Sequence, residues 1–117
     1  MDSSSVGAQG ENIAKKFLES EGYAIVSQNF RTKFGEIDLI ALKGGYLIFI
    51  EVKSRSGELF GSPAEAVTKK KLDKIIKSSN VFISQNEELP QNIRYDAVEV
   101  FYDKGEAKIN HIENITL

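Results

Sequence analysis

The pattern of apolar and polar positions divides the chain into seven predicted elements. Helical spacing of Ala14, Phe17 and Leu18 predicts a first helix from about Val6, with Gly22 as its stop. The order αβββαββ predicts a mixed α/β fold in a single domain over residues 6–117, after a flexible tail at 1–5. The other predicted elements are strands at 23–30, 36–42 and 46–55, a helix from Ser62 to about Phe82, and strands at 93–102 and 107–112.

The pair Gly44-Gly45 between two apolar runs predicts a tight β-hairpin, because both central positions of a type I′ turn need positive φ. With these glycines as the loop, Asp38 lies opposite Glu51, and Glu36 lies opposite Lys53. Side chains alternate along a strand, so these four share one face. Both faces are otherwise apolar, which predicts a central hairpin covered on both sides. The first face continues with Ile40, Leu42, Leu47 and Phe49, and the other carries Ile37, Leu39, Ala41, Ile48, Ile50 and Val52.

The opposed carboxylates of Asp38 and Glu51 are candidates for metal ligands. Like charges directly across two strands repel each other, and partial burial raises the cost. A divalent cation removes that conflict, and hard oxygen ligands without sulfur suit Mg²⁺ or Mn²⁺. The alternative is a wet end of the sheet at which Glu36 and Lys53 form an ordinary cross-strand pair.

Glu11 is a third candidate ligand. It shares a helical stripe with Ala14 and Leu18, so it points toward the sheet from the first turns of the helix. An acidic residue near a helix N-terminus is also favoured by the helix dipole alone. Both interpretations remain open from the sequence.

The second predicted helix is basic. Its start carries a capping pattern at Ser62-Pro63-Ala64-Glu65. Residues 53–77 hold seven basic and three acidic side chains, so they carry a charge of +4 in a chain of net charge −2. This asymmetry is typical either of an anion-binding surface or of a solvated helix face. The candidate nucleic-acid contacts are Arg55, Lys70, Lys71, Lys74 and Lys77.

Composition narrows the classes of function and the expected location. The chain has 117 residues and no cysteine, which excludes disulfides, thiolate zinc sites and cysteine nucleophiles. Residues 1–5 are polar and acidic where a signal peptide needs basic and then apolar residues. The apolar run 46–50 is far shorter than a membrane span. We therefore expect a cytoplasmic protein with no membrane partner.

Three polar residues in the last quarter of the chain are expected to have structural roles. His111, the only histidine, is expected at the surface or on an edge strand. Arg94 and Asp96 share one face of a strand and are expected to form an ion pair.

Asp38, followed thirteen residues later by Glu51-Val52-Lys53, resembles the PD-(D/E)XK signature of restriction-endonuclease-like nucleases. Over roughly residues 7–100 the chain resembles the YraN-like family, predicted relatives of Holliday-junction resolvases. Leu72 stands where the family usually has a polar residue, which weakens a catalytic role for the second helix. The proline that precedes the first acidic residue of the PD-(D/E)XK signature is absent, as is normal for this family. The matching segments are Gly10-Glu11 with Ala14, Gly22-Tyr23, Asn29-Phe30-Arg31, Gly35 to Ile40, Phe49 to Lys53, Phe60-Gly61, Val67 with Lys71, and Arg94-Tyr95-Asp96.

The resemblance implies a restriction-endonuclease-like fold, with a mixed central sheet flanked by helices. It also implies that Asp38, Glu51 and the carbonyl of Val52 bind Mg²⁺ or Mn²⁺, while Lys53 assists attack on a phosphodiester. Glu36 then either holds the amine of Lys53 or forms a simple salt bridge with it.

The function implied is Mg²⁺-dependent cleavage of DNA, with branched or damaged DNA among the candidate substrates. One metal cluster per domain predicts a homodimer wherever paired cuts are made. The alternatives are a nucleic-acid-binding module of the same fold with little or no turnover, and a phosphoesterase that acts on small molecules.

Overall fold

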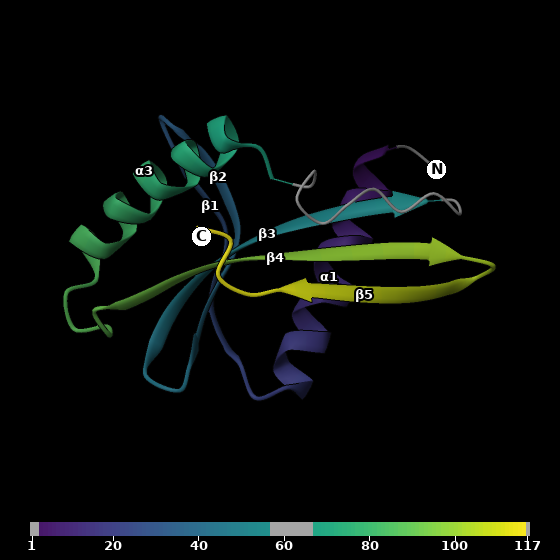
Figure 1. Cartoon of the computed structure of the whole chain (residues 1–117), viewed down its shortest axis with the longest axis horizontal. Coiled ribbons are helices and arrows are strands. Elements are labelled where there is room, and N and C mark those ends of the chain that lie inside the picture. The colour runs from purple at the N-terminus through teal and green to yellow at the C-terminus, as the bar shows by residue number, and fades with distance from the viewer. Residues whose placement is uncertain (1–2, 57–66, 117) are drawn as a thin grey trace.

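The computed structural model describes residues 3–56 and 67–116 (Figure 1). Its elements follow the predicted order αβββαββ. Helix α1 begins at Ser3, three residues before the predicted start. The elements are α1 (Ser3–Ser20), β1 (Ala24–Thr32), β2 (Gly35–Lys43), β3 (Tyr46–Ser56), α3 (Lys69–Gln85), β4 (Asn92–Asp103) and β5 (Glu106–Ile112).

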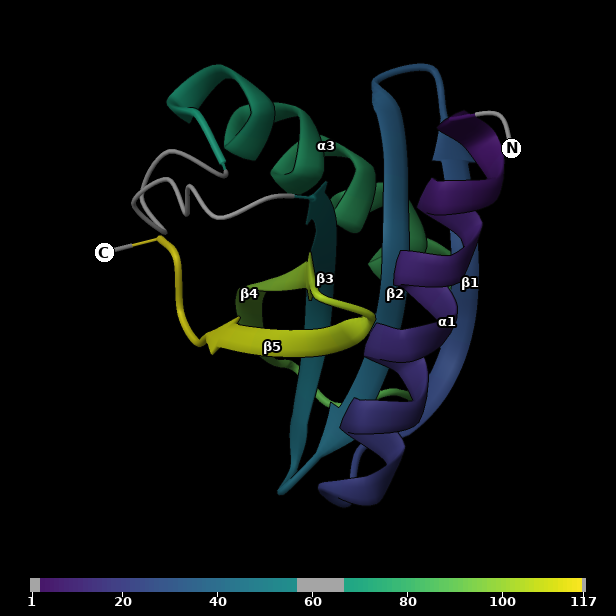
Figure 2. The same ribbon diagram turned by 90° about the vertical axis from the view of Figure 1, so that its right-hand side faces the viewer.

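The five strands form one mixed sheet in the order β1-β2-β3-β4-β5. Strands β3 and β4 run parallel, whereas the other three neighbouring pairs are antiparallel. The connection between the parallel strands contains α3, as parallel pairing requires a long crossover. Helices α1 and α3 lie on opposite faces of the sheet (Figure 2).

Two hydrophobic cores lie on the two faces of the sheet. The core under α1 contains Leu18 and Ile50, and the core under α3 contains Phe49 and Phe82. Residues of β2 and β3 alternate between these cores because successive side chains of a strand point to opposite faces. The prediction of a central hairpin covered on both sides is confirmed.

The hairpin register also matches the prediction. Pairing runs from Lys43–Tyr46 to Leu39–Ile50, and Gly44 has a φ of 57°. The turn therefore uses the left-handed backbone conformation that favours glycine. Among the described residues the ladder between β2 and β3 stops at Leu39–Ile50, one pair before Asp38 and Glu51.

Helix α3 starts later than predicted. The predicted start at residues 62–65 lies outside the described residues, but Thr68 is extended, with ψ at 162°. A continuous helix from Ser62 is therefore wrong. The Thr68 side chain is the N-cap and accepts a 3.1 Å hydrogen bond from the backbone N–H of Lys71. This cap fixes the orientation of the first turn, which carries Lys70 and Lys71.

No helix among the described residues is long and apolar enough to cross a membrane.

Candidate functional site

Strand β2 changes face at Asp38. A regular strand would put Ile37 and Leu39 on the same face, yet Ile37 packs under α3 and Leu39 packs under α1. On β1, Asn29 occupies the position opposite Asp38 in the register of the flanking pairs. Its φ is 52°, in the left-handed region that asparagine tolerates better than most residues. Because of this irregularity in both strands, the side chains of residues 36 and 37 point to the faces of the sheet opposite to those predicted.

This reversal corrects two predictions. Ile37 does not share a face with Leu39, and Glu36 is not the partner of Lys53. Glu36 pairs with Arg31 of β1 instead, at 3.2 Å between Nε and Oε2. The prediction assumed unbroken alternation from the Gly44-Gly45 turn, and the alternation fails at Asp38.

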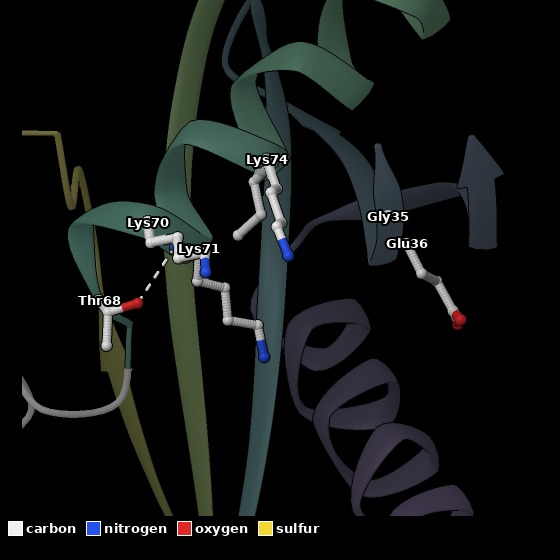
Figure 3. A pocket seen from close by; sticks show the side chains of 7 residues that line it. Gly35, Glu36, Thr68, Lys70, Lys71 and Lys74 are labelled. Carbon is white, nitrogen blue, oxygen red and sulfur yellow. Dashed lines mark hydrogen bonds between the residues drawn. The ribbon is translucent and has the colours of Figure 1, made fainter. Parts of the chain in front are cut away.

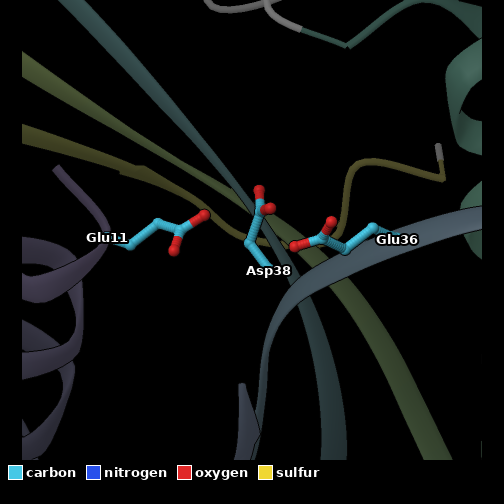
Figure 4. A group of neighbouring side chains, drawn as sticks. All are labelled: Glu11, Glu36 and Asp38. Carbon is cyan, nitrogen blue, oxygen red and sulfur yellow. The ribbon is translucent and has the colours of Figure 1, made fainter. Parts of the chain in front are cut away.

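The same reversal gathers three carboxylates. Glu11 from α1, Glu36 and Asp38 offer oxygen atoms that all lie within 4.8 Å of one another. Figure 4 shows the side chains of Glu11 and Glu36 reaching toward Asp38 from opposite sides. With the amide of Asn29 oriented to donate, its nitrogen lies 3.2 Å from Glu11 Oε2 and 2.6 Å from Glu36 Oε1. Asn29 therefore ties α1 and β2 together at this cluster.

Helix α1 approaches the sheet closely beside the cluster. A Cβ built on Gly10 would lie 1.7 Å from Ser54 Oγ and 3.1 Å from Ser54 Cβ on β3. Glycine is thus required for this spacing unless Ser54 moves. Since Glu11 is the next residue, the close approach also sets how far its carboxylate reaches over the sheet.

Asp38 and Glu51 are neighbours, as the hairpin predicted. The Asp38 carboxylate accepts a 2.7 Å hydrogen bond from the backbone N–H of Val52, and its carboxyl also hydrogen-bonds Glu51. Burial, followed by the charge of Glu51, raises the pKa of Asp38 to about 8. Burial and then Glu36 also raise the pKa of Glu11. The site therefore holds more negative charge than its own residues neutralise.

Two lysines face Glu51, which is 5% exposed. Lys71 of α3 forms an ion pair with it, and Lys53 Nζ lies 3.9 Å from Glu51 Oε1. The neighbouring Lys71 side chain, followed by burial, lowers the pKa of Lys53. Burial alone would lower the pKa of Lys71, but its hydrogen bonds with Glu51 and Lys53 raise it. The pairing of Lys71 with Glu51 was missed because it joins elements that are distant in sequence. The signals that the sequence offered were the match of Val67 with Lys71 to the family and the position of Lys71 at the border of the apolar face of its helix.

A basic pocket of about 380 Å³ lies beside the carboxylates. Figure 3 shows Lys70, Lys71 and Lys74 of α3 on one side and Glu36 at the start of β2 on the other. The pocket joins the predicted basic surface to the carboxylate cluster through Glu36. Its lining is Gly35, Glu36, Thr68, Lys70, Lys71, Lys74 and Ile75.

The other two candidate nucleic-acid contacts have protein partners. Lys77 pairs with Asp73 one turn earlier on α3, at 3.1 Å, and both side chains are exposed. Arg55 Nε lies 3.2 Å from an oxygen of Glu99, which is fully buried on β4. Arg55 therefore compensates a buried charge, and its predicted contact with nucleic acid stays a prediction.

A second polar cluster surrounds Asp96 on β4. The predicted ion pair is present, since Arg94 donates to both carboxylate oxygens at 2.9 and 2.8 Å. His111 Nε2 lies 2.8 Å from Asp96 Oδ2, and the backbone N–H of Asn114 donates to Oδ1 at 3.0 Å. His111 lies on the edge strand β5, as expected, and its side chain is 13% exposed.

Comparison with known sequences gives one consistent family. The pattern of the uncharacterised protein family UPF0102 matches residues 10–100. A UPF0102 protein of Clostridium kluyveri is 43% identical over 98 residues, which cover 84% of this chain and 80% of the relative. One from Sulfurihydrogenibium is 43% identical over 114 residues, covering 97% and 96%. One from Vibrio campbellii is 42% identical over 111 residues, covering 93% and 89%.

Proposed function

The chain belongs to the UPF0102 (YraN) family, as its resemblance to that family predicted, and on this premise we propose that it is a metal-dependent nuclease that cleaves DNA. The observation that carries the proposal is the convergence of Glu11, Glu36 and Asp38 beside Glu51. The mixed sheet with a helix on each face is compatible with the restriction-endonuclease-like fold, which is part of the proposal.

The carboxylates fit a hard divalent cation. Oxygen atoms of Glu11, Glu36 and Asp38 lie within 4.8 Å of one another, and hard oxygen donors are the ligands that Mg²⁺ and Mn²⁺ prefer. Burial, followed by the charge of Glu51, raises the pKa of Asp38 to about 8, so a bound cation would stabilise its ionised form. Asp38, Glu51 and Glu11 would hold the ion, with the carbonyl of Val52 as a further ligand. Glu36 joins this set on the geometry of the structure.

Each residue around the cluster has a proposed role. A bound Mg²⁺ or Mn²⁺ supplies Lewis acidity toward a phosphate oxygen and lowers the pKa of bound water. Lys53, beside Glu51, orients the attacking water or compensates charge on the phosphate. Lys71 holds the carboxylate of Glu51 in position from α3. Asn29 donates to Glu11 and Glu36 and keeps these side chains over the strand break.

The basic pocket supports a polyanionic substrate. Lys70 and Lys74 are exposed and line the pocket next to Glu36, so a phosphate held there lies close to the carboxylates. Contacts to phosphates position a nucleic acid without reading its sequence. We therefore propose DNA as the partner, with branched or damaged DNA among its forms.

A nucleic-acid-binding module without turnover is the second candidate function. The ion pair of Lys71 with Glu51 favours it, because an ammonium group already neutralises one of the proposed metal ligands. In that case the DNA affinity would survive removal of both Asp38 and Glu51.

The test is a cleavage assay on duplex, nicked, flapped and four-way DNA with Mg²⁺ or Mn²⁺. We expect cleavage by the wild type, and a loss of at least about 100-fold in Asp38→Asn and Lys53→Ala, because removing one electrostatic group from a site costs about that much. Metal titration by calorimetry should separate the two variants. Asp38→Asn should lose metal binding, whereas Lys53→Ala should retain it.

Glu11→Gln and Glu19→Gln form a matched control pair on α1. Both remove one carboxylate from the same helix, but Glu19 is exposed and outside the cluster. Only Glu11→Gln should reduce cleavage. If wild-type protein binds neither Mg²⁺ nor Mn²⁺ at millimolar concentration with DNA present, the nuclease function is wrong and the binding module replaces it.

We also propose a homodimer, because cuts in both strands of a duplex need two clusters and a two-fold pair supplies them. Sedimentation at tens of micromolar with DNA should show the dimer. Monomer alone under those conditions would contradict it.

A further inference from the structure

The turn between β1 and β2 is fixed against α3. Thr32 Oγ1 lies 2.8 Å from Ser78 Oγ of α3 and accepts a 3.0 Å hydrogen bond from the backbone N–H of Phe34. Gly35, with φ at 145°, brings the backbone close enough that a Cβ there would lie 4.0 Å from Lys74 Cβ. The turn is therefore positioned by its contacts with α3 at Thr32 and Gly35 and by the hydrogen bond within the turn.

The turn carries the aromatic ring of Phe34, and the ammonium groups of two lysines lie over that ring. Lys33 Nζ lies 5.2 Å from the centroid of the Phe34 ring, and Lys77 Nζ of α3 lies 5.9 Å from it. Phe34 is half-buried, whereas Lys33, Lys74 and Lys77 are exposed. We call these four residues the turn surface. An aromatic face flanked by cations is suited to a group that is both planar and anionic.

The turn surface is continuous with the basic pocket. Gly35, the residue after Phe34, lines the pocket, and so does Lys74. The pocket in turn reaches Glu36 of the carboxylate cluster. An extended anionic chain that lies in the pocket can therefore pass over Phe34. The exposed lysines around the ring disfavour an apolar protein partner, because interface cores are depleted of charge.

We propose that Phe34 is a stacking platform for an unpaired base of a nucleic-acid strand, whose flanking phosphates are held by Lys33, Lys74 and Lys77. This rests on the proposed function for the nature of the partner, and it narrows the substrate to strands with at least one unstacked base next to the cleavage site. A fully paired duplex keeps its bases stacked on one another and offers only its phosphates to this surface.

The experiment compares two labelled strands of equal length by fluorescence anisotropy in EDTA, so that no cleavage occurs. One is an oligothymidine of about 12 nucleotides, and the other carries the same phosphates on abasic spacers. We expect wild-type protein to prefer the strand with bases, and Phe34→Leu to lose about 5- to 100-fold of that preference. Phe34→Tyr keeps the ring and should retain most of it. Because the ratio cancels the phosphate contacts, it isolates the stacking contribution.

Tyr46→Leu is the matched control. Tyr46 is likewise an aromatic residue at a hairpin turn, and it is more exposed than Phe34. Arg94 lies 6.0 Å from its ring centroid, but Tyr46 is at the opposite end of β2 from Phe34. Its substitution should leave the ratio unchanged, and thermal unfolding checks that both leucine variants are folded. An unchanged ratio in folded Phe34→Leu overturns the proposal, as does a wild type that binds both strands equally.

The result separates this proposal from the nuclease function. A ratio that depends on Phe34 in a protein that cleaves none of the DNA substrates supports the stacking platform and rejects the nuclease. Cleavage without any dependence of the ratio on Phe34 rejects the stacking platform alone.

Discussion

Asp38 on β2 and Asp96 on β4 belong to one sheet, with β3 between their strands, yet their surroundings shift the two carboxyl pKa values in opposite directions. Asp96 is fully buried and receives four hydrogen bonds, two of them from Arg94. Burial alone would raise its pKa, but the hydrogen bonds from His111, Arg94 and Asn114 lower it. Asp38 accepts one backbone hydrogen bond and lies beside Glu51 and Glu11; burial first, and then the charges of Glu51 and Glu11, raise its pKa to about 8.

The difference separates a structural carboxylate from a candidate functional one. Around Asp96, Arg94 also donates a hydrogen bond to the hydroxyl of Tyr23, and the whole group joins β4, β5 and the connection between α1 and β1 into one network. Such a network stabilises the fold only while every member is present. Asp38, in contrast, is partly buried beside two other carboxylates, an arrangement that is common at functional sites.

Substituting each aspartate with asparagine should give the largest contrast in stability. Asp96→Asn removes the charge that compensates Arg94 in a buried site, so we expect a loss of about 3–5 kcal/mol in the free energy of unfolding. Asp38→Asn removes repulsion, so its stability without metal should stay equal or rise. Urea denaturation at pH 7 in EDTA measures both. Equal losses in the two variants would show that Asp38 is as structural as Asp96.

The pH dependence of the same two variants sharpens the contrast. Asp38 has a pKa of about 8 in the folded protein and an ordinary value of 3.8, so the folded state holds a proton that the unfolded state releases between these values. Its contribution to stability is complete below pH 3.8 and is lost as the pH rises toward 8. Relative to wild type, Asp38→Asn should therefore gain stability between pH 4 and pH 8, by at most about 5 kcal/mol.

The stability contribution of Asp96 depends on pH in the opposite direction. Its pKa is lowered in the folded protein, so its stabilisation is present above the ordinary pKa and is lost as the pH falls through the folded value. Asp96→Asn should thus be least different from wild type in acid. A parallel pH profile for the two variants would contradict the assignment of different environments.

The parts of this fold that depend on neighbouring residues could be predicted from the sequence. The Gly44-Gly45 turn determines its own register, and the register brought Asp38 next to Glu51 correctly. The Arg94–Asp96 pair follows from alternation on one strand. In each case the signal is local, because the interacting positions are set by one strand or one two-residue turn.

The missed features depend on contacts between distant segments. The break at Asp38 accompanies the left-handed conformation of Asn29, one strand away, and no residue pattern marks it. Because the break reverses Glu36, the predicted partner of Lys53 was wrong. The contacts of His111 with Asp96 and of Lys71 with Glu51 likewise require the tertiary arrangement of β5 and α3.

Gly10→Ala should disturb the carboxylate cluster around Asp38 and leave the network around Asp96 unchanged. The added methyl group would meet Ser54, so we expect a loss of about 1–2 kcal/mol, in the range of an overpacked core, and a displacement of Glu11 from the cluster. Cleavage should fall with it. Ser54→Gly in the same chain removes both clashing atoms and should restore activity. Failure of this second substitution to restore activity would mean that the spacing of α1 does not position Glu11.

Glu36→Gln should have the smallest effect on stability. It decides whether Glu36 belongs to the carboxylate cluster or only to a surface ion pair. Its partner Arg31 is 81% exposed, and such pairs contribute about 0–1 kcal/mol, so stability should change by less than about 0.5 kcal/mol. The charge of Glu36 is, after burial, the largest cause that raises the pKa of Glu11. NMR titration of the Glu11 carboxyl should therefore show a lower pKa in Glu36→Gln, whereas Arg31→Gln, which removes the ion pair but keeps the carboxylate, should not lower it. If both variants leave the pKa of Glu11 unchanged, the charge of Glu36 does not reach Glu11 and Glu36 only forms an ion pair with Arg31. The proposed cation site then reduces to Glu11, Asp38 and Glu51.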